Sequence, residues 1–143
     1  MIKKLLLFNE YFERNKAYYT LLELAIIAGI LYTFRITDFL HAPLVTAHVS
    51  NLIGSIIGTL LIIGPASFQK PRLHAKRIGA AIIIMTALNL SLELSAPINT
   101  IDLPFLYWEY FNTPDLVDAV FGISGIAMIV GIIKVRAHRA FKE

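Results

Sequence analysis

Four long apolar segments constrain the fold more than any other feature of this sequence. They cover residues 20–39, 48–68, 78–95 and 116–135. A helix needs about 20 apolar residues to cross a bilayer core of roughly 30 Å, and each segment is close to that length. Lipid offers no hydrogen-bond partner to the backbone, so a spanning segment must be helical. The sequence therefore predicts an all-α integral membrane protein, with a single transmembrane domain of four helices over residues 1–143.

The composition agrees with a membrane protein. Apolar residues make up 57% of the chain and charged residues only 16%, whereas roughly a quarter of the residues in a soluble domain are charged. A soluble fold of 143 residues could not bury so much apolar surface. The chain has no cysteine, which excludes disulfides, zinc–thiolate sites and thiol nucleophiles.

The basic residues predict an orientation. Twelve of the 13 Lys and Arg residues flank the apolar segments on one side, and only Arg35 falls on the other. By the positive-inside rule both termini of this multi-pass protein are cytoplasmic. We attribute the net charge of +3 to insertion and to contact with anionic lipid, and we expect no nucleic-acid partner. The twelve are Lys3, Lys4, Arg14 and Lys16 before the first segment, Lys70, Arg72, Lys76 and Arg77 between the second and third, and Lys134, Arg136, Arg139 and Lys142 after the fourth.

Residues 1–18 have an amphipathic pattern. Leu5, Phe8 and Phe12 recur at helical spacing, while most charged residues of this stretch lie on other faces. This pattern is typical of a helix lying on a membrane surface. A cytoplasmic extension of the first span would have the same pattern, and the sequence leaves both interpretations open.

The connection between the third and fourth segments is rich in aromatic residues. Tyr107, Trp108 and Tyr110 lie between Phe105 and Phe111. Such side chains favour the headgroup layer of a membrane. We expect an outer aromatic loop that rests on the membrane, or one that acts as a lid over a lipid-facing cleft.

Polar residues gather at the outer ends of the predicted helices. Residues three or four apart share a helix face, so each of three helices has a polar or small face in its outer half. A charge that faces lipid costs about 2.5 kcal/mol or more at mid-membrane, and we therefore expect these faces to turn toward one another. Arg35 is the only Lys or Arg near them. The faces comprise His48, Asn51, Ser55 and Gly58 in the second helix, Asn89 and Glu93 in the third, and Asp115, Asp118, Gly122 and Gly125 in the fourth.

These residues also have simpler interpretations. Thr113, Pro114 and Asp115 form an ordinary helix start, which explains Asp118, one turn further along, less well. Glu93 could reach the headgroups without binding anything. Gly54 and Gly58 form a G-x-x-x-G motif that favours packing within the chain over a dimer seam.

We expect neither a metal site nor a cofactor. His41 and His48 lie near acidic residues, but their spacing is not that of metal ligands. No stretch resembles a phosphate-binding loop or a serine nucleophile elbow. The sequence therefore predicts no catalytic residue, although an enzyme assembled from scattered polar residues stays open.

Three stretches of the second half resemble the VanZ-like family of small bacterial membrane proteins. They are "GPASFQKPR", "ALNLSLEL" ending in Glu93 and Leu94, and "FNTPDLVDAVFGISG" with Asp115 and Gly122, within residues 64–130. The chain departs from the family pattern at Ala96, Asn112 and Ala119, where the family has Gln, Asp and Asn. The resemblance implies a role at the cell envelope, associated in the family's prototype with resistance to the glycopeptide teicoplanin. It also implies that Glu93 and Asp115 form an outer-leaflet site.

Three functions remain as alternatives. The leading hypothesis is a multi-pass protein of the bacterial inner membrane with an outward-facing polar cleft that recognises an envelope lipid or lipid-linked precursor. The second is a small proton-coupled transporter, with Glu23 or Glu93 as the coupling carboxylate, which would need a homodimer to enclose a path. The third is a non-catalytic subunit that packs against a larger membrane protein through its glycine-bearing faces.

Overall fold

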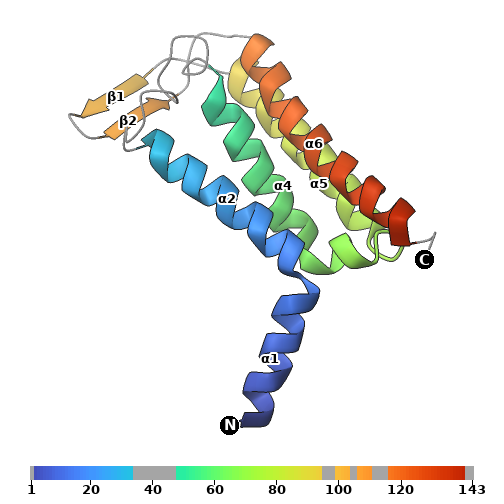
Figure 1. The fold of residues 1–143 in the computed structure, drawn as a ribbon. Helices are drawn as coiled ribbons and strands as arrows, with labels where there is room; N and C mark the ends of the chain where they lie inside the picture. The colour runs from blue at the N-terminus through green and yellow to red at the C-terminus, as the bar shows by residue number, and fades with distance from the viewer. Residues whose placement is uncertain (1, 34–47, 95–98, 104–105, 111–115, 141–143) are drawn as a thin grey trace.

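The computed structural model of the protein describes residues 2–33, 48–94, 99–103, 106–110 and 116–140. Within these ranges the chain is mainly helical, with one short hairpin and with turns at residues 15, 48 and 70–74 (Figure 1). The elements are α1 (Ile2–Arg14), α2 (Lys16–Thr33), α4 (Val49–Gln69), α5 (Ala75–Leu94), β1 (Asn99–Leu103), β2 (Leu106–Tyr110) and α6 (Leu116–Ala140). The all-α prediction is confirmed, and α4, α5 and α6 cover the last three predicted segments. The first predicted segment ends at 39, so residues 34–39 lie outside the described residues.

Helices α2, α4, α5 and α6 form a bundle in which α4 contacts the other three (Figure 1). The core lies where α4 meets α6, around the fully buried side chains of Leu60, Ile63 and Ile129. Ala81 of α5 and Tyr18 of α2 complete this cluster. Each of the four helices thus contributes one apolar face to the same core.

Two glycines allow the helices of the bundle to approach closely. A Cβ at Gly125 of α6 would lie 2.8 Å from the carbonyl oxygen of Leu52 in α4. A Cβ at Gly58 of α4 would lie 2.6 Å from the Met85 side chain of α5. The prediction of packing within the chain is therefore confirmed for Gly58. Gly54, the other glycine of the G-x-x-x-G motif, faces open space.

Helix α4 is kinked near its C-terminal end. Gly64 has φ 67° and is followed by Pro65, a residue that lacks the N–H needed for the helical ladder. One turn before the kink, the Leu60 carbonyl accepts a hydrogen bond of 2.7 Å from the hydroxyl of Tyr18. The Tyr18 ring also packs edge-on against Phe68 beyond the kink, with centroids 5.4 Å apart. Tyr18 therefore joins α2 to both sides of the α4 kink.

The helix is interrupted at Asn15, between α1 and α2. The side-chain amide of Asn15 donates to the carbonyl of Tyr11 at 2.8 Å, and the same carbonyl accepts from the Asn15 backbone N–H at 3.2 Å. Helix α1 then turns away from the line of α2 and leaves the bundle (Figure 1). Residues 2–14 therefore form a helix separate from α2, whereas residues 16–18 belong to α2. That α1 lies on a membrane surface stays a prediction.

The segment expected to be an aromatic loop contains an antiparallel hairpin. Leu103 pairs with Leu106, and Ile101 pairs with Trp108. The aromatic residues of β2 have high β-propensity. They were expected to lie at the membrane interface, and no strand was predicted from them. The hairpin contacts α2 near the end of the bundle where α4 and α6 begin (Figure 1).

The surface of the bundle is apolar. Two of the described helices, Val49–Gln69 and Val117–Arg139, are long and apolar enough to cross a membrane. Only 28% and 39% of their most apolar stretches are buried, far less than in the core helix of a soluble protein. Helices α2 and α5 are not among these two helices, which were identified within the described residues alone. They also expose large apolar side chains, including Leu24, Ile27, Ile30, Ile83 and Leu88.

Candidate functional site

A buried amide joins three helices in the half of the bundle away from the basic residues. The Asn89 amide nitrogen of α5 donates to the Ser55 hydroxyl of α4 at 2.8 Å and to the Met85 carbonyl at 2.8 Å. The Ser55 hydroxyl lies 3.2 Å from the Asn89 side-chain oxygen, to which it can donate. Both side chains are buried, and a buried polar group that lost its partner would be costly. These bonds therefore fix the amide in one orientation.

Helix α6 completes this arrangement with a glycine. A Cβ at Gly122 would lie 1.8 Å from the Asn89 side-chain oxygen, so a residue larger than glycine at 122 would displace the amide. The polar or small faces of α4, α5 and α6 thus meet at Ser55, Asn89 and Gly122. The sequence prediction that these faces turn toward one another is confirmed at these three residues.

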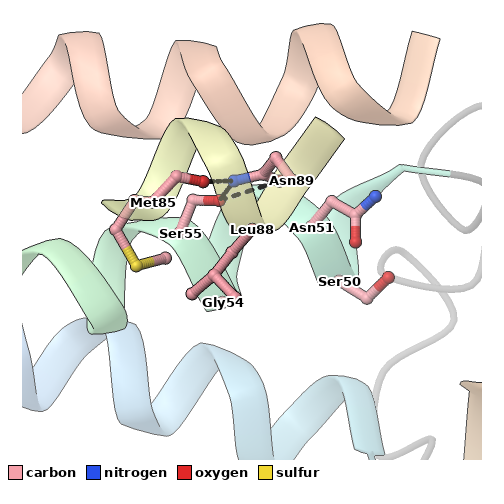
Figure 2. A pocket seen from close by; sticks show the side chains of 7 residues that line it. All are labelled: Ser50, Asn51, Gly54, Ser55, Met85, Leu88 and Asn89. Atoms are coloured by element: carbon pink, nitrogen blue, oxygen red, sulfur yellow. Dashed lines mark hydrogen bonds between the residues drawn. The ribbon is translucent and has the colours of Figure 1, made fainter. Parts of the chain in front are cut away.

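A cleft of about 230 Å³ opens beside Asn89 on the surface between α4 and α5. Figure 2 shows Ser55 and Asn89 hydrogen-bonded to each other, and Ser50 and Asn51 nearer the start of α4. Gly54 leaves open space there, and Leu88 is exposed. The lining is neutral: amides, hydroxyls and apolar groups, from Ser50, Asn51, Gly54, Ser55, Met85, Leu88 and Asn89.

His48 and Asp118 form a second polar group, between the first turns of α4 and α6. The His48 Nδ1 is paired with a carboxylate oxygen of Asp118. Asp118 is 4% exposed, and the His48 ring stacks on Phe121 with centroids 4.8 Å apart. His48 directly precedes α4 but makes no capping hydrogen bond with its side chain, so the ring can reach α6. Asp118 therefore contacts another helix, which helix capping alone does not explain.

The single polar cluster expected from the sequence is divided into these two groups. Asn51 and Asn89 line the cleft, whereas His48 and Asp118 are not among its lining residues. Arg35 and Asp115 lie outside the described residues, as does the side chain of Glu93 in the last turn of α5. The expectation that Arg35 offsets several carboxylates is untested, and the described partner of Asp118 is His48. Tyr107, Trp108 and Tyr110 all belong to β2, and their side chains also lie outside the described part.

Sequence reasoning missed part of the cleft lining. Ser50, Met85 and Leu88 carry no signal of their own, because single hydroxyl and apolar residues are common in any such helix. Gly54 had a signal, the G-x-x-x-G motif, but the motif indicated packing whereas the residue borders open space. In the part of the chain that the structure describes, no three His, Cys, Asp or Glu side chains come together as metal ligands would.

The opposite end of the bundle is basic. The N-terminal ends of α2 and α5 and the C-terminal ends of α4 and α6 lie together there (Figure 1). Eight exposed Lys and Arg residues of the described part occupy these ends and the connection between α4 and α5. They are Lys16, Lys70, Arg72, Lys76, Arg77, Lys134, Arg136 and Arg139. The molecule thus has a basic end and, away from it, the end that holds the cleft and the His48–Asp118 pair.

No family model matches this chain, and neither a curated protein nor a solved structure matches it. The resemblance to the VanZ-like family therefore depends on the quoted residues alone.

Proposed function

We propose that this protein crosses the bacterial inner membrane four times, with both termini in the cytoplasm. Three observations support this placement: the apolar length of α4 and α6, the large apolar side chains exposed on α2 and α5, and the basic residues at one end. Lys and Arg are retained on the cytoplasmic side during insertion. The end with the cleft then faces the periplasm.

We further propose that the cleft between α4 and α5 binds the headgroup of an envelope amphiphile. The observation that carries this proposal is a mainly apolar cleft, open on an apolar surface, whose lining also includes the uncharged polar side chains of Asn51, Ser55 and Asn89. A headgroup could enter sideways and exchange hydrogen bonds with amides and hydroxyls while its acyl chains stay in the bilayer. Because no charged residue is among the described residues that line the cleft, we expect selectivity for hydroxyl or amide groups rather than for charge.

The size of the cleft limits what it can hold. Its volume of about 230 Å³ is below the ~300–1,000 Å³ typical of pockets that enclose a whole small molecule. At roughly 30 Å³ for each water in the liquid, the space equals about seven or eight waters. It suits one glycerol or sugar unit of a headgroup, not an entire lipid-linked precursor.

The VanZ-like role at the envelope stays part of this proposal. In that family Glu93 and Asp115 would act at the outer leaflet. Glu93 belongs to the last turn of α5 and Asp115 directly precedes α6 in the sequence. In this proposal both residues contact the distal part of a headgroup whose proximal part lies against Asn89.

Filling the cleft tests the proposal. Gly54→Leu places a side chain in the cleft, where a Cβ meets no atom within 4 Å. Gly131→Leu in α6 is the matched control, since its Cβ also meets nothing and it does not line the cleft. The probes are a monoglucosyl diacylglycerol and phosphatidylglycerol, which carry hydroxyls, and phosphatidylcholine, whose headgroup has no donor.

Native mass spectrometry of the protein with each lipid gives the readout. We expect the wild type and Gly131→Leu to retain one hydroxyl-bearing lipid in preference to phosphatidylcholine, and Gly54→Leu to lose that preference. Equal retention of all three lipids by the wild type, or an unchanged preference in Gly54→Leu, would contradict the proposal.

A further inference from the structure

Helix α1 presents an apolar face that the bundle covers only in part. Phe8 is 69% exposed, and Tyr11 and Phe12 are also exposed. These residues lie three or four apart and share one face, whereas Glu10 and Glu13 lie away from it. In a monomer in water these rings would be in contact with solvent. Burial of this face therefore requires either lipid or another protein.

The aromatic contacts at the elbow between α1 and α2 define where this face points. The Phe12 ring stacks on Tyr19 of α2 with centroids 5.3 Å apart, and the Tyr11 ring meets the same residue at 6.5 Å. The apolar face of α1 is therefore on the inner side of the elbow, the side toward α2. If α2 enters a bilayer at the elbow, the apolar face of α1 is turned toward that bilayer.

The elbow is braced by α4. The side-chain amide of Gln69, the last residue of α4, donates to the backbone carbonyl of Arg14 at 2.6 Å. Asn15 is buried and bonds back to Tyr11, while Tyr18 is tied to Leu60. Helix α1 is thus held at a defined angle to the bundle by contacts on both of its neighbours.

The charge around the elbow complements an anionic surface. Lys4, Arg14 and Lys16 are exposed at the same end as the basic residues of α4, α5 and α6, and only Glu10 and Glu13 of α1 oppose them there among the described residues. Each Lys or Arg near an anionic membrane favours binding, and long basic side chains can reach headgroups while their stems contact apolar groups.

We propose that α1 is an interfacial anchor, which lies on the anionic lipid surface at the basic end of the bundle and inserts Phe8 and Phe12 between the headgroups. The inference depends on the membrane placement proposed above but not on the cleft. The partner of α1 in this proposal is lipid, and not a second copy of the chain or another protein.

Single cysteines test the anchor, because the native chain has none. An environment-sensitive probe is attached to Phe8→Cys on the apolar face, to Glu10→Cys on the opposite face of α1, or to Met128→Cys, an exposed position within α6. Each full-length variant is reconstituted in nanodiscs that contain brominated phosphatidylcholine, with or without phosphatidylglycerol. Bromine on the acyl chains quenches a probe that is inserted, and aqueous iodide quenches a probe in water.

We expect bromine to quench the probes at 8 and 128 and iodide to quench the probe at 10. Phosphatidylglycerol should increase the quenching at 8 and leave that at 128 unchanged. In discs with phosphatidylglycerol, Lys4→Gln and Arg14→Gln should each lower the ratio of inserted to free α1 by roughly fivefold.

Quenching at 128 without quenching at 8 would overturn the anchor and leave the membrane placement standing. Protection of the probe at 8 from both bromine and iodide would mean that protein covers α1, which also overturns the proposal. Failure of bromine to quench at 128 would overturn the membrane placement and the anchor together.

Discussion

Asn89 of α5 occupies the space directly over the backbone of Gly122 in α6. A Cβ added at 122 would lie 1.8 Å from the Asn89 side-chain oxygen, and Asn89 is held there by Ser55 and by the Met85 carbonyl. Asn89 therefore belongs both to the lining of the cleft and to the contact between α5 and α6.

Gly122→Ala should destabilise the bundle by about 1–3 kcal/mol, the usual cost of forcing an extra methyl group into a packed site. Gly131→Ala is the matched control in the same helix. Its Cβ meets nothing within 4 Å, so the change should be neutral or stabilising by up to about 1 kcal/mol. Denaturant unfolding in detergent measures both. Equal stabilities of the two variants would show that Asn89 does not occupy this position.

Truncating Asn89 should relieve the clash. Asn89→Ala alone loses two hydrogen bonds and leaves Ser55 without its described partner, at about 1–3 kcal/mol. With Gly122→Ala added, the further loss should be much smaller than in the wild-type background, because the amide is no longer in the way. Strictly additive losses in the double-mutant cycle would contradict direct contact between the two residues.

The His48–Asp118 pair should stabilise the contact between α4 and α6. Asp118→Ala should cost about 1.5–3 kcal/mol, the range for a hydrogen bond that involves a charged group. His48→Ala also removes the stacking on Phe121 and should cost as much or more. The double variant should lose less than the sum of the two single losses. Ser124→Ala is the control for changes in helix propensity, because Ser124 is exposed and its hydroxyl bonds to the Val120 carbonyl of the same helix. A loss of stability in Ser124→Ala as large as that in Asp118→Ala would refute a special role for the pair.

The hydroxyl of Tyr18 should contribute separately from its ring. Tyr18→Phe keeps the ring packed against Phe68 but removes the donor to the Leu60 carbonyl. We expect a loss of about 1 kcal/mol, whereas Tyr18→Ala should lose about 3–5 kcal/mol through the missing ring. A Tyr18→Phe variant as stable as the wild type would mean that the Leu60 carbonyl finds another donor at the α4 kink.

Much of the bundle could be predicted from local sequence. Apolar length located α4, α5 and α6, because in lipid every spanning segment must satisfy its own backbone. Spacing of three and four residues also identified the inward faces that carry Ser55, Asn89 and Gly122. In each case the physical cause acts within one helix, so one helix at a time is enough to find it.

The remaining features depend on how elements are placed against each other. Spacing identifies the face on which Asp118 lies, but not how far α6 slides along α4, and that offset brings Asp118 to His48 rather than to the cleft. Gly54 and Gly58 have the same pattern in sequence, yet only Gly58 meets another helix. The break at Asn15 was not expected either, because it depends on contacts that the local sequence does not show: the Asn15 amide bonds to the Tyr11 carbonyl, and Gln69 of α4 bonds to the Arg14 carbonyl.

Cysteine accessibility tests most directly whether the basic end and the cleft end lie on opposite sides of a bilayer. His74→Cys marks the connection between α4 and α5, and Glu109→Cys marks the hairpin. Each is expressed in bacterial cells and treated with a membrane-impermeant maleimide. We predict that position 109 reacts in intact cells and that position 74 reacts only after the inner membrane is permeabilised. Reaction of both positions in intact cells, or of neither until permeabilisation, would contradict the proposed topology.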